Sequence, residues 1–125
     1  MKPTILLIED DPMTSRLVEL TLTHAGYQVV LVSDGPRGIE MAQADPPDLI
    51  LLDLMLPGPD GFAVLTQLRA EPRTADVPVV VISSKSQLAD KQIASTIGAS
   101  AYLTKPYKRS ELLQTISSLL SEKLE

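Results

Sequence analysis

Residues 49–61 read Leu49-Ile50-Leu51-Leu52-Asp53-Leu54-Met55-Leu56-Pro57-Gly58-Pro59-Asp60-Gly61. Four apolar residues run without a break into one carboxylate, Asp53, and prolines and glycines then end any regular structure. A run that is this short and apolar, and is bounded by turn residues, is typical of a strand buried on both faces. The stretch therefore predicts a buried strand that delivers Asp53 into a turn at its C-terminal end.

The same pattern of an apolar run followed by polar residues occurs four more times. Strands are expected at about residues 5–8, 27–32, 77–82 and 101–103, and helices at about residues 12–24, 36–44, 60–71 and 88–97 and through residues 112–120. Buried strands that alternate with helices predict a parallel, doubly wound α/β sheet. Because no linker or low-complexity segment divides the chain, we expect residues 1–125 to form one domain.

Aspartates mark three of the expected helix starts. Asp11 before Pro12, Asp34 and Asp60 are good N-caps, because an aspartate side chain accepts hydrogen bonds from the N–H groups of the first helical turn. Asp11 and Asp60 are therefore interpreted as caps and not as ligands, and Ser84 as a residue that begins the fourth helix. In the first helix, one stripe at helical spacing is formed by Met13, Leu17, Leu20 and His24.

The composition argues against several classes of site. Without cysteine the chain has no disulfide or thiolate chemistry, which fits a reducing cytoplasm. The net charge of −5 argues against a nucleic-acid face, and 3 Tyr with 1 Phe are too few for a base-stacking platform. No apolar run approaches the ~20 residues of a membrane helix, and because Met1-Lys2-Pro3 leads straight into the first strand, no signal peptide is expected. We therefore expect a cytoplasmic protein that binds neither nucleic acid nor membrane.

Polar side chains follow four of the predicted strands. Glu9 and Asp10 follow the first strand, Asp53 ends the third, Ser83 follows the fourth and Lys105 follows the fifth. In parallel sheets, ligands bind at the carboxyl ends of the strands where the strand order reverses. If the first and third strands are neighbours there, three carboxylates converge and repel, so that a proton or a cation must join them. The sequence therefore predicts a cation site at this edge of the sheet.

These side chains suit phosphoryl transfer. Hard oxygen ligands with open positions favour Mg²⁺, or Mn²⁺ in its place, and leave room for a phosphate oxygen. Asp53 can then act as the nucleophile and form an acyl phosphate. Lys105 would neutralise a second phosphoryl oxygen, and Ser83 would donate a hydrogen bond to a third. One cation, one lysine and one hydroxyl thus match the three oxygens of a phosphoryl group.

From about residue 4 to residue 121, the sequence resembles the receiver domain of bacterial two-component response regulators, and in length the single-domain chemotaxis type. The family's motifs are matched by Glu9 and Asp10 (acidic pair), Asp53 (phosphoacceptor), Pro57–Gly61 (Pro-x-x-Asp-Gly turn), Ser83 (switch hydroxyl), Tyr102 (switch aromatic) and Lys105–Pro106. The resemblance implies a flavodoxin-like (βα)5 fold with strand order 2-1-3-4-5.

The resemblance also implies a metal site. Asp10, Asp53 and the backbone carbonyl of Met55 would bind Mg²⁺ directly, and Glu9 would act through water. The Lys105–Pro106 peptide bond would be cis.

A switch is implied in the same way. The phosphoryl group would draw Ser83 inward, Tyr102 would turn into the vacated space, and the face built from the fourth helix, fifth strand and fifth helix would change. Met55, Ser84 and Lys85 would tune the lifetime of the phosphoryl group. We further hypothesise that Lys85 reaches the mouth of the site.

Other functions fit parts of the sequence. A hydrolase of the haloacid dehalogenase type also uses an aspartate nucleophile, but it needs Asp-x-Asp after the first strand, where this chain has Glu9-Asp10-Asp11. A degenerate receiver used only as a binding module is disfavoured by the intact acid, hydroxyl and lysine set. A nucleotide site lacks its Gly-rich loop, and the acidic first loop would repel a flavin phosphate.

The resemblance implies partners as well as chemistry. A histidine kinase or phosphotransfer protein would act upstream, and a protein target downstream. The chain would catalyse only its own phosphoryl transfer and dephosphorylation, and is not expected to be a conventional enzyme. A monomer and a phosphorylation-dependent dimer are both compatible with the sequence, as are a complete regulator and a piece of a longer one.

Overall fold

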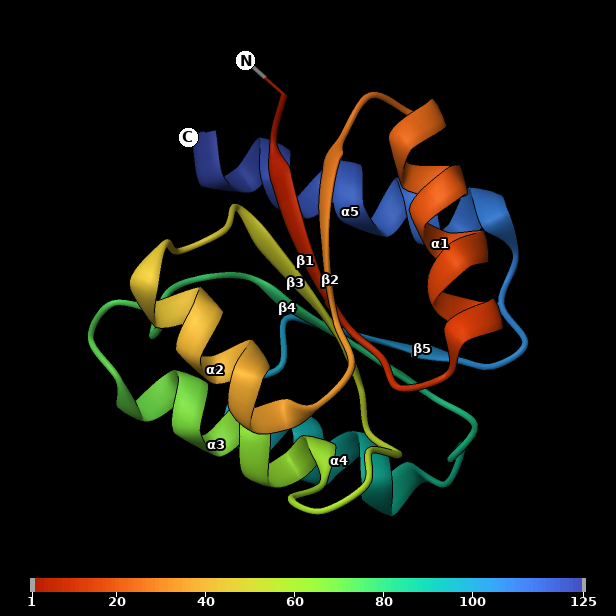
Figure 1. The fold of residues 1–125 in the computed structure, drawn as a ribbon. Coiled ribbons are helices and arrows are strands. Elements are labelled where there is room, and N and C mark those ends of the chain that lie inside the picture. Colours follow the sequence, from red (N-terminus) through yellow and green to blue (C-terminus); the bar gives the residue numbers. More distant parts are fainter. Residues whose placement is uncertain (1, 125) are drawn as a thin grey trace.

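A five-stranded parallel sheet lies at the centre of the fold (Figure 1). The computed structural model describes residues 2–124, with side chains to residue 122. The strands are β1 (Thr4–Ile8), β2 (Gln28–Val32), β3 (Leu49–Asp53), β4 (Val79–Ser83) and β5 (Ala101–Thr104). Their order is β2-β1-β3-β4-β5, which confirms the predicted α/β fold and strand order. Because the order reverses between β1 and β3, the carboxyl ends of these strands flank the usual ligand position of such sheets.

Helices cover both faces of this sheet. In the described part of the chain they are α1 (Pro12–His24), α2 (Gly35–Ala44), α3 (Gly61–Ala70), α4 (Leu88–Ile97) and α5 (Arg109–Leu124). In Figure 1, α1 and α5 lie on one face and α2, α3 and α4 on the other. Each face has its own apolar core, and every residue of β3 and β4 is buried, as predicted for residues 49–53. No helix among the described residues is both long and apolar enough to cross a membrane.

The predicted aspartate caps are confirmed. Each side chain accepts a hydrogen bond from the backbone N–H three residues on: Asp11 from Thr14 (3.1 Å), Asp34 from Arg37 (2.9 Å) and Asp60 from Ala63 (3.0 Å). These bonds satisfy N–H groups that have no partner within the helix. The starts of α1, α2 and α3, and with them the lengths of the loops before these helices, are therefore set locally.

The apolar stripe of α1 faces away from the sheet. Met13 is 82% exposed and Leu17 67% exposed, whereas Val18 and Leu22 are buried against the sheet. The helix carries apolar residues on two sides, and the side with Val18 and Leu22 belongs to the apolar core that includes residues of β1 and α5. An amphipathic stripe alone does not say which side is buried when both are apolar.

The fourth strand begins two residues later than expected. Pro78 has no N–H and cannot donate to β3, although its carbonyl accepts from the Ile50 N–H at 2.9 Å. The paired register therefore starts with Val79 opposite Ile50.

Helix α4 is attached differently at its two ends. Its N-cap is Gln87, whose side chain makes no capping bond, so the interpretation of Ser84 as the helix start is wrong; the chain continues as an exposed loop beyond β4. At the other end, Arg69 of α3 donates from Nε to the carbonyl of Gly98 at 2.9 Å. Ala94 is the buried residue of the helix. The C-terminal end of α4 is thus held to α3, while few contacts hold its N-terminal end.

Candidate functional site

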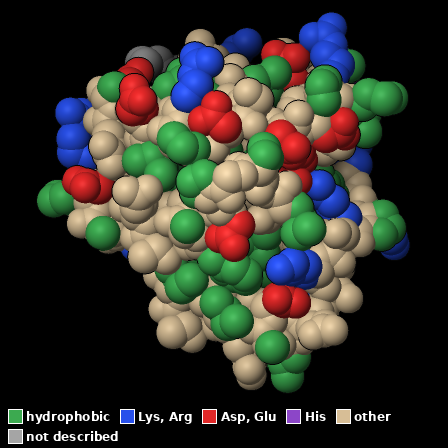
Figure 2. All heavy atoms as spheres, turned by 60° about the horizontal axis from the view of Figure 1, so that its bottom comes forward, with side chains coloured by type: hydrophobic (Ala, Val, Ile, Leu, Met, Phe, Trp, Pro, Cys, Tyr) green, Lys and Arg blue, Asp and Glu red, His purple; other side chains and the backbone are tan. Residues whose placement is uncertain are grey.

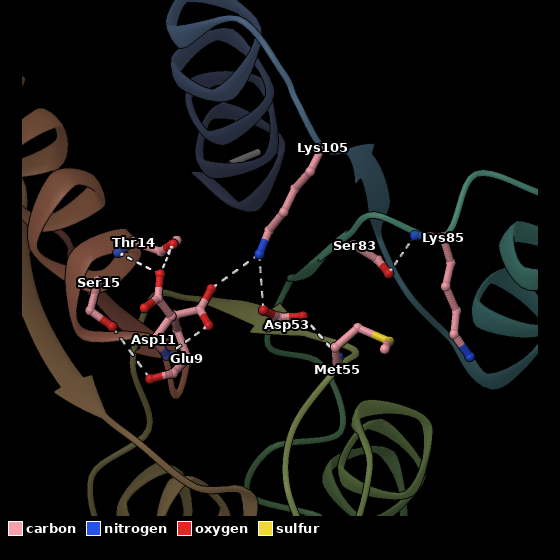
Figure 3. A network of polar contacts seen from close by, with 9 residues as sticks. All are labelled: Glu9, Asp11, Thr14, Ser15, Asp53, Met55, Ser83, Lys85 and Lys105. Atoms are coloured by element: carbon pink, nitrogen blue, oxygen red, sulfur yellow. Dashed lines mark hydrogen bonds and ion pairs between the residues drawn. The ribbon is translucent and has the colours of Figure 1, made fainter.

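The predicted site residues meet at the carboxyl edge of the sheet (Figure 3). Glu9 and Asp10 directly follow β1, Asp53 ends β3 and Ser83 ends β4. The parallel register explains the convergence, because Asp53 lies opposite Ile82 in β4, so that the ends of β3 and β4 are level. The strand order and register therefore bring these residues to one edge of the sheet.

A lysine joins two buried carboxylates at the centre of this edge. Lys105 Nζ lies 3.0 Å from Asp53 Oδ2 and 3.3 Å from Glu9 Oε1. The side chains of Glu9 and Asp53 are 2% and 5% exposed, whereas that of Lys105 is 30% exposed. Because burial makes an unpaired charge costly, the ammonium offsets the repulsion between the two acids. The Lys105–Pro106 peptide bond is cis, which confirms that prediction.

The acidic side chains form a pocket of oxygens that fits a hard cation. One carboxylate oxygen from each of Glu9, Asp10 and Asp53 lies within 4.8 Å of the others. Glu9 and Asp53 are buried while Asp10 is exposed, so the group is open to solvent on one side. Carboxylates that leave positions for water are the ligand set that Mg²⁺ favours.

The acceptor carboxylate is held by its own turn. Asp53 Oδ1 accepts a hydrogen bond from the backbone N–H of Met55 at 2.8 Å, while Oδ2 faces Lys105. The next turn is closed by the Gly61 N–H, which donates to the carbonyl of Leu54 at 3.0 Å. Both carboxylate oxygens therefore have a fixed direction in the protein.

The predicted switch residues meet on the backbone of Lys85. Ser83 is buried, and its Oγ accepts from the Lys85 N–H at 3.0 Å. The hydroxyl of Tyr102 donates to the Lys85 carbonyl at 2.8 Å. In Figure 3 the Lys85 side chain runs away from Asp53. Its ammonium lies 5.9 Å from the centroid of the Phe62 ring.

The remaining predicted tuning residue lies elsewhere on the surface. Ser84 is exposed and lines a groove between α1 and α5, together with Leu17, Lys105 and Tyr107. Phe62 was not identified as a site residue from the sequence, because an aromatic in the first turn of a helix reads as a core residue. No local signal connects it with Lys85, which lies far along the chain in the loop after β4.

The environment of Glu9 changes its acidity. Burial and the contact with Asp53 raise the pKa of Glu9, while a hydrogen bond from the Asp11 N–H and the charge of Lys105 lower it, so that the pKa lies at about 7 and not at 4.5. Burial alone would lower the pKa of Lys105, but its hydrogen bond and charge interaction with Asp53, together with the charge of Glu9, raise it overall. In the protein without metal, the Glu9 carboxyl therefore keeps its proton to a higher pH than an ordinary glutamate does, because its pKa is raised.

This acidity predicts a pH dependence of stability. The folded protein binds the Glu9 proton more tightly than the unfolded chain, so this contribution to stability is present below pH 4.5 and is lost as the pH rises through about 7. Between about pH 5 and about pH 8, the free energy of unfolding in EDTA should fall by at most about 3 kcal/mol. Urea unfolding of the wild type and of Glu9→Gln measures this, and the variant should show a flatter profile. Equal profiles would contradict the assignment to Glu9.

Comparisons with known proteins agree on one family. Residues 5–117 match the family described as "Response regulator receiver domain". The chain is 47% identical over 118 residues to the "DNA-binding dual master transcriptional regulator RpaA" of Synechocystis sp., which covers 94% of this chain and 49% of that protein. It is 34% identical to "Protein PilH" of Pseudomonas aeruginosa, covering 94% of this chain and 97% of that protein.

A solved structure has the same fold. It is the receiver domain of sensor histidine kinase PA1611 from Pseudomonas aeruginosa, with a magnesium ion coordinated in its active site cleft. The TM-score is 0.90 at 31% identity, covering 97% of this chain and 99% of that chain. The present chain spans about half the length of RpaA but nearly all of PilH. By its family match and its relatives, the chain belongs to the response regulator receiver domains of bacterial two-component signalling.

Proposed function

We propose that this chain is a phosphorylation-dependent switch that accepts a phosphoryl group on Asp53. The observation that carries the proposal is the buried Asp53 carboxylate, with Lys105 Nζ 3.0 Å from one oxygen and the acids Glu9 and Asp10 beside it. An isolated buried ion pair would not need two further carboxylates, whereas a phosphoryl site needs ligands for a cation.

The chemistry of the proposed step follows from the contacts. A carboxylate oxygen of Asp53 attacks phosphorus, and the bond between phosphorus and the donor breaks, with its electron pair leaving on the histidine nitrogen of a protein donor or the acetate oxygen of acetyl phosphate. Lys105, already directed at Asp53, can pair with a phosphoryl oxygen, and the hydroxyl of Ser83 can donate to another. The chain would catalyse only this transfer and the later hydrolysis of its own acyl phosphate, and would not act as a conventional enzyme.

A divalent cation is part of the proposal. Glu9, Asp10, Asp53 and the backbone carbonyl of Met55 would hold Mg²⁺, or Mn²⁺ in its place, with Glu9 acting through water. When bound, the ion would supply positive charge to a phosphoryl oxygen. The oxygen ligands gathered within 4.8 Å and the magnesium in the PA1611 receiver domain support this assignment.

The proposed switch joins the site to the face of α4, β5 and α5. Movement of Ser83 toward a phosphoryl group would break its bond with the Lys85 N–H, and the Lys85 carbonyl is the group that Tyr102 contacts. One loop therefore links the acceptor to an aromatic on β5. A phosphoryl group can change a distant surface when its charge shifts such a loop between two conformations.

The surface around the site fits an upstream protein donor. A groove of about 720 Å³ between α1 and α5 reaches Lys105 and Pro106, and the exposed side chain of Leu17 is part of its lining. Because a donor must bring its phosphohistidine to Asp53, its surface must cover this rim. We propose that the apolar side of α1 contacts a histidine kinase or phosphotransfer protein.

The downstream partner is proposed to be a protein. On the face drawn in Figure 2, acidic and basic side chains are interspersed with hydrophobic ones, unlike the continuous basic surface that binds a phosphate backbone. RpaA is a DNA-binding regulator, and about half of it lies outside the match. For the present chain we propose a cytoplasmic location without nucleic-acid or membrane binding, as a monomer or a phosphorylation-dependent dimer.

Intact-mass measurement after incubation with acetyl phosphate tests the proposal. With Mg²⁺ we expect one added phosphoryl group, and with EDTA none. Release of inorganic phosphate from an external phosphate ester, without a covalent adduct, would instead indicate a hydrolase. Absence of any adduct at the shortest accessible times would favour a receiver that acts only as a binding module.

A further inference from the structure

The ammonium of Lys85 contacts the ring of Phe62, and neither group takes part in the phosphoryl transfer proposed for Asp53. Phe62 lies in the first turn of α3, is half-buried and packs against the core below α2, α3 and α4. Lys85 lies in the exposed loop after β4, with its ammonium 5.9 Å from the centre of the Phe62 ring. The two residues therefore join α3 to the loop that carries the switch.

This contact borders the acceptor site. A hollow of about 360 Å³ is lined by Asp10, Met55, Phe62 and Lys85, among others. Asp10 belongs to the acidic cluster, and the Met55 N–H holds Asp53 Oδ1. The hollow thus extends from the acids to the ring, and Lys85 forms part of its wall.

The ring is the described partner of the Lys85 ammonium. Among the residues whose side chains the structure describes, no carboxylate forms an ion pair with Lys85, whereas Lys105 pairs with both Glu9 and Asp53. The Lys85 backbone is fixed at both ends, by the Ser83 hydroxyl and by Tyr102. The Lys85 side chain can therefore still adopt different conformations. The Phe62 ring stabilises the conformation in which the side chain points away from Asp53.

We propose that Phe62 is a positioning residue that competes with the phosphoryl group on Asp53 for the Lys85 ammonium. This inference rests on the proposed function. Hydrolysis occurs when water adds to phosphorus and the bond to the Asp53 oxygen breaks, releasing the carboxylate, hydrogen phosphate and one proton. A lysine paired with a phosphoryl oxygen covers that approach, whereas a lysine held on the ring leaves it open. Phe62 therefore shortens the lifetime of the acyl phosphate.

The decay of the phosphorylated protein tests this role. The wild type, Phe62→Leu, Phe62→Tyr, Lys85→Met and the double variant Phe62→Leu/Lys85→Met are phosphorylated with acetyl phosphate and Mg²⁺, desalted and followed by intact mass. Phe62→Leu should lengthen the half-life by about two- to five-fold, the range of an exposed cation–π contact. Phe62→Tyr keeps the ring and should behave as the wild type. In the Lys85→Met background, Phe62→Leu should change nothing.

The outcomes separate this inference from the proposed function. A wild type that takes up no phosphoryl group overturns both. If the adduct forms but Phe62→Leu decays at the wild-type rate, only the role of Phe62 is overturned. The same follows if Phe62→Leu has an equal effect with and without Lys85, because a packing defect alone would act in both backgrounds. Circular dichroism of each variant identifies a misfolded protein. If Phe62→Leu is misfolded, the two single variants Phe62→Tyr and Lys85→Met still test the contact.

Discussion

Asp53→Asn is expected to abolish the phosphoryl adduct completely. The substitution keeps the size of the side chain, so the buried site can retain its shape, but a neutral amide is not a nucleophile toward phosphorus. It also removes one of the three carboxylates that lie within 4.8 Å of one another, and one of the two acids paired with Lys105. Intact mass after incubation with acetyl phosphate and Mg²⁺ measures the loss.

A matched control lies at the other end of the same loop, between β3 and α3. Asp60 caps α3 by accepting a hydrogen bond from the Ala63 N–H, and asparagine caps a helix about as well as aspartate. Asp60→Asn should therefore form the adduct like the wild type. An adduct on the Asp53→Asn protein would show that another residue accepts the phosphoryl group, and peptide mapping would locate it.

Gly61→Ala, at the first residue of α3, is expected to destabilise the protein strongly. A Cβ at this position would lie 2.5 Å from the Cα of Leu54 and 2.8 Å from the carbonyl oxygen of Asp53. Both atoms belong to the backbone, so no flexible side chain can move aside. We expect a loss of about 3 kcal/mol, as for severe overpacking, measured by urea unfolding. Because the displaced backbone carries the acceptor, phosphorylation should also slow.

Another glycine separates this effect from backbone strain. Gly26 has a φ of +100°, and a Cβ there would meet nothing within 4 Å, so Gly26→Ala tests conformational cost alone, about 1 kcal/mol. No positive φ is found at Gly61, where close approach is the cause. Equal losses for the two variants would contradict the close-packing argument.

The parts of the fold that the sequence predicts are those set by local patterns. An apolar run such as 49–52 can only be buried on both faces, and an aspartate before a helix caps it whatever lies beyond. The meeting of Glu9, Asp53 and Lys105 follows from strand ends in a parallel sheet, so it too could be predicted. Their roles in phosphoryl transfer remain predictions that the variants above test.

Other features depend on tertiary packing that no local pattern encodes. The stripe through Met13 and Leu17 was apparent in the sequence, but the buried side of α1 was decided by Val18 and Leu22, which contact the sheet. The contact of Lys85 with Phe62 requires the loop after β4 and the start of α3 to be neighbours.

Helix α4 is held more firmly at its C-terminal end than at its N-terminal end, so it can pivot about the C-terminal end. The Arg69–Gly98 hydrogen bond holds its C-terminal end, and Ala94 is its residue buried in the core. At the opposite end, Leu88 is 69% exposed. A displacement of the loop before α4 is therefore expected to move the Leu88 end of the helix most and the Gly98 end least, so a protein that contacts the Leu88 end would respond to the position of that loop.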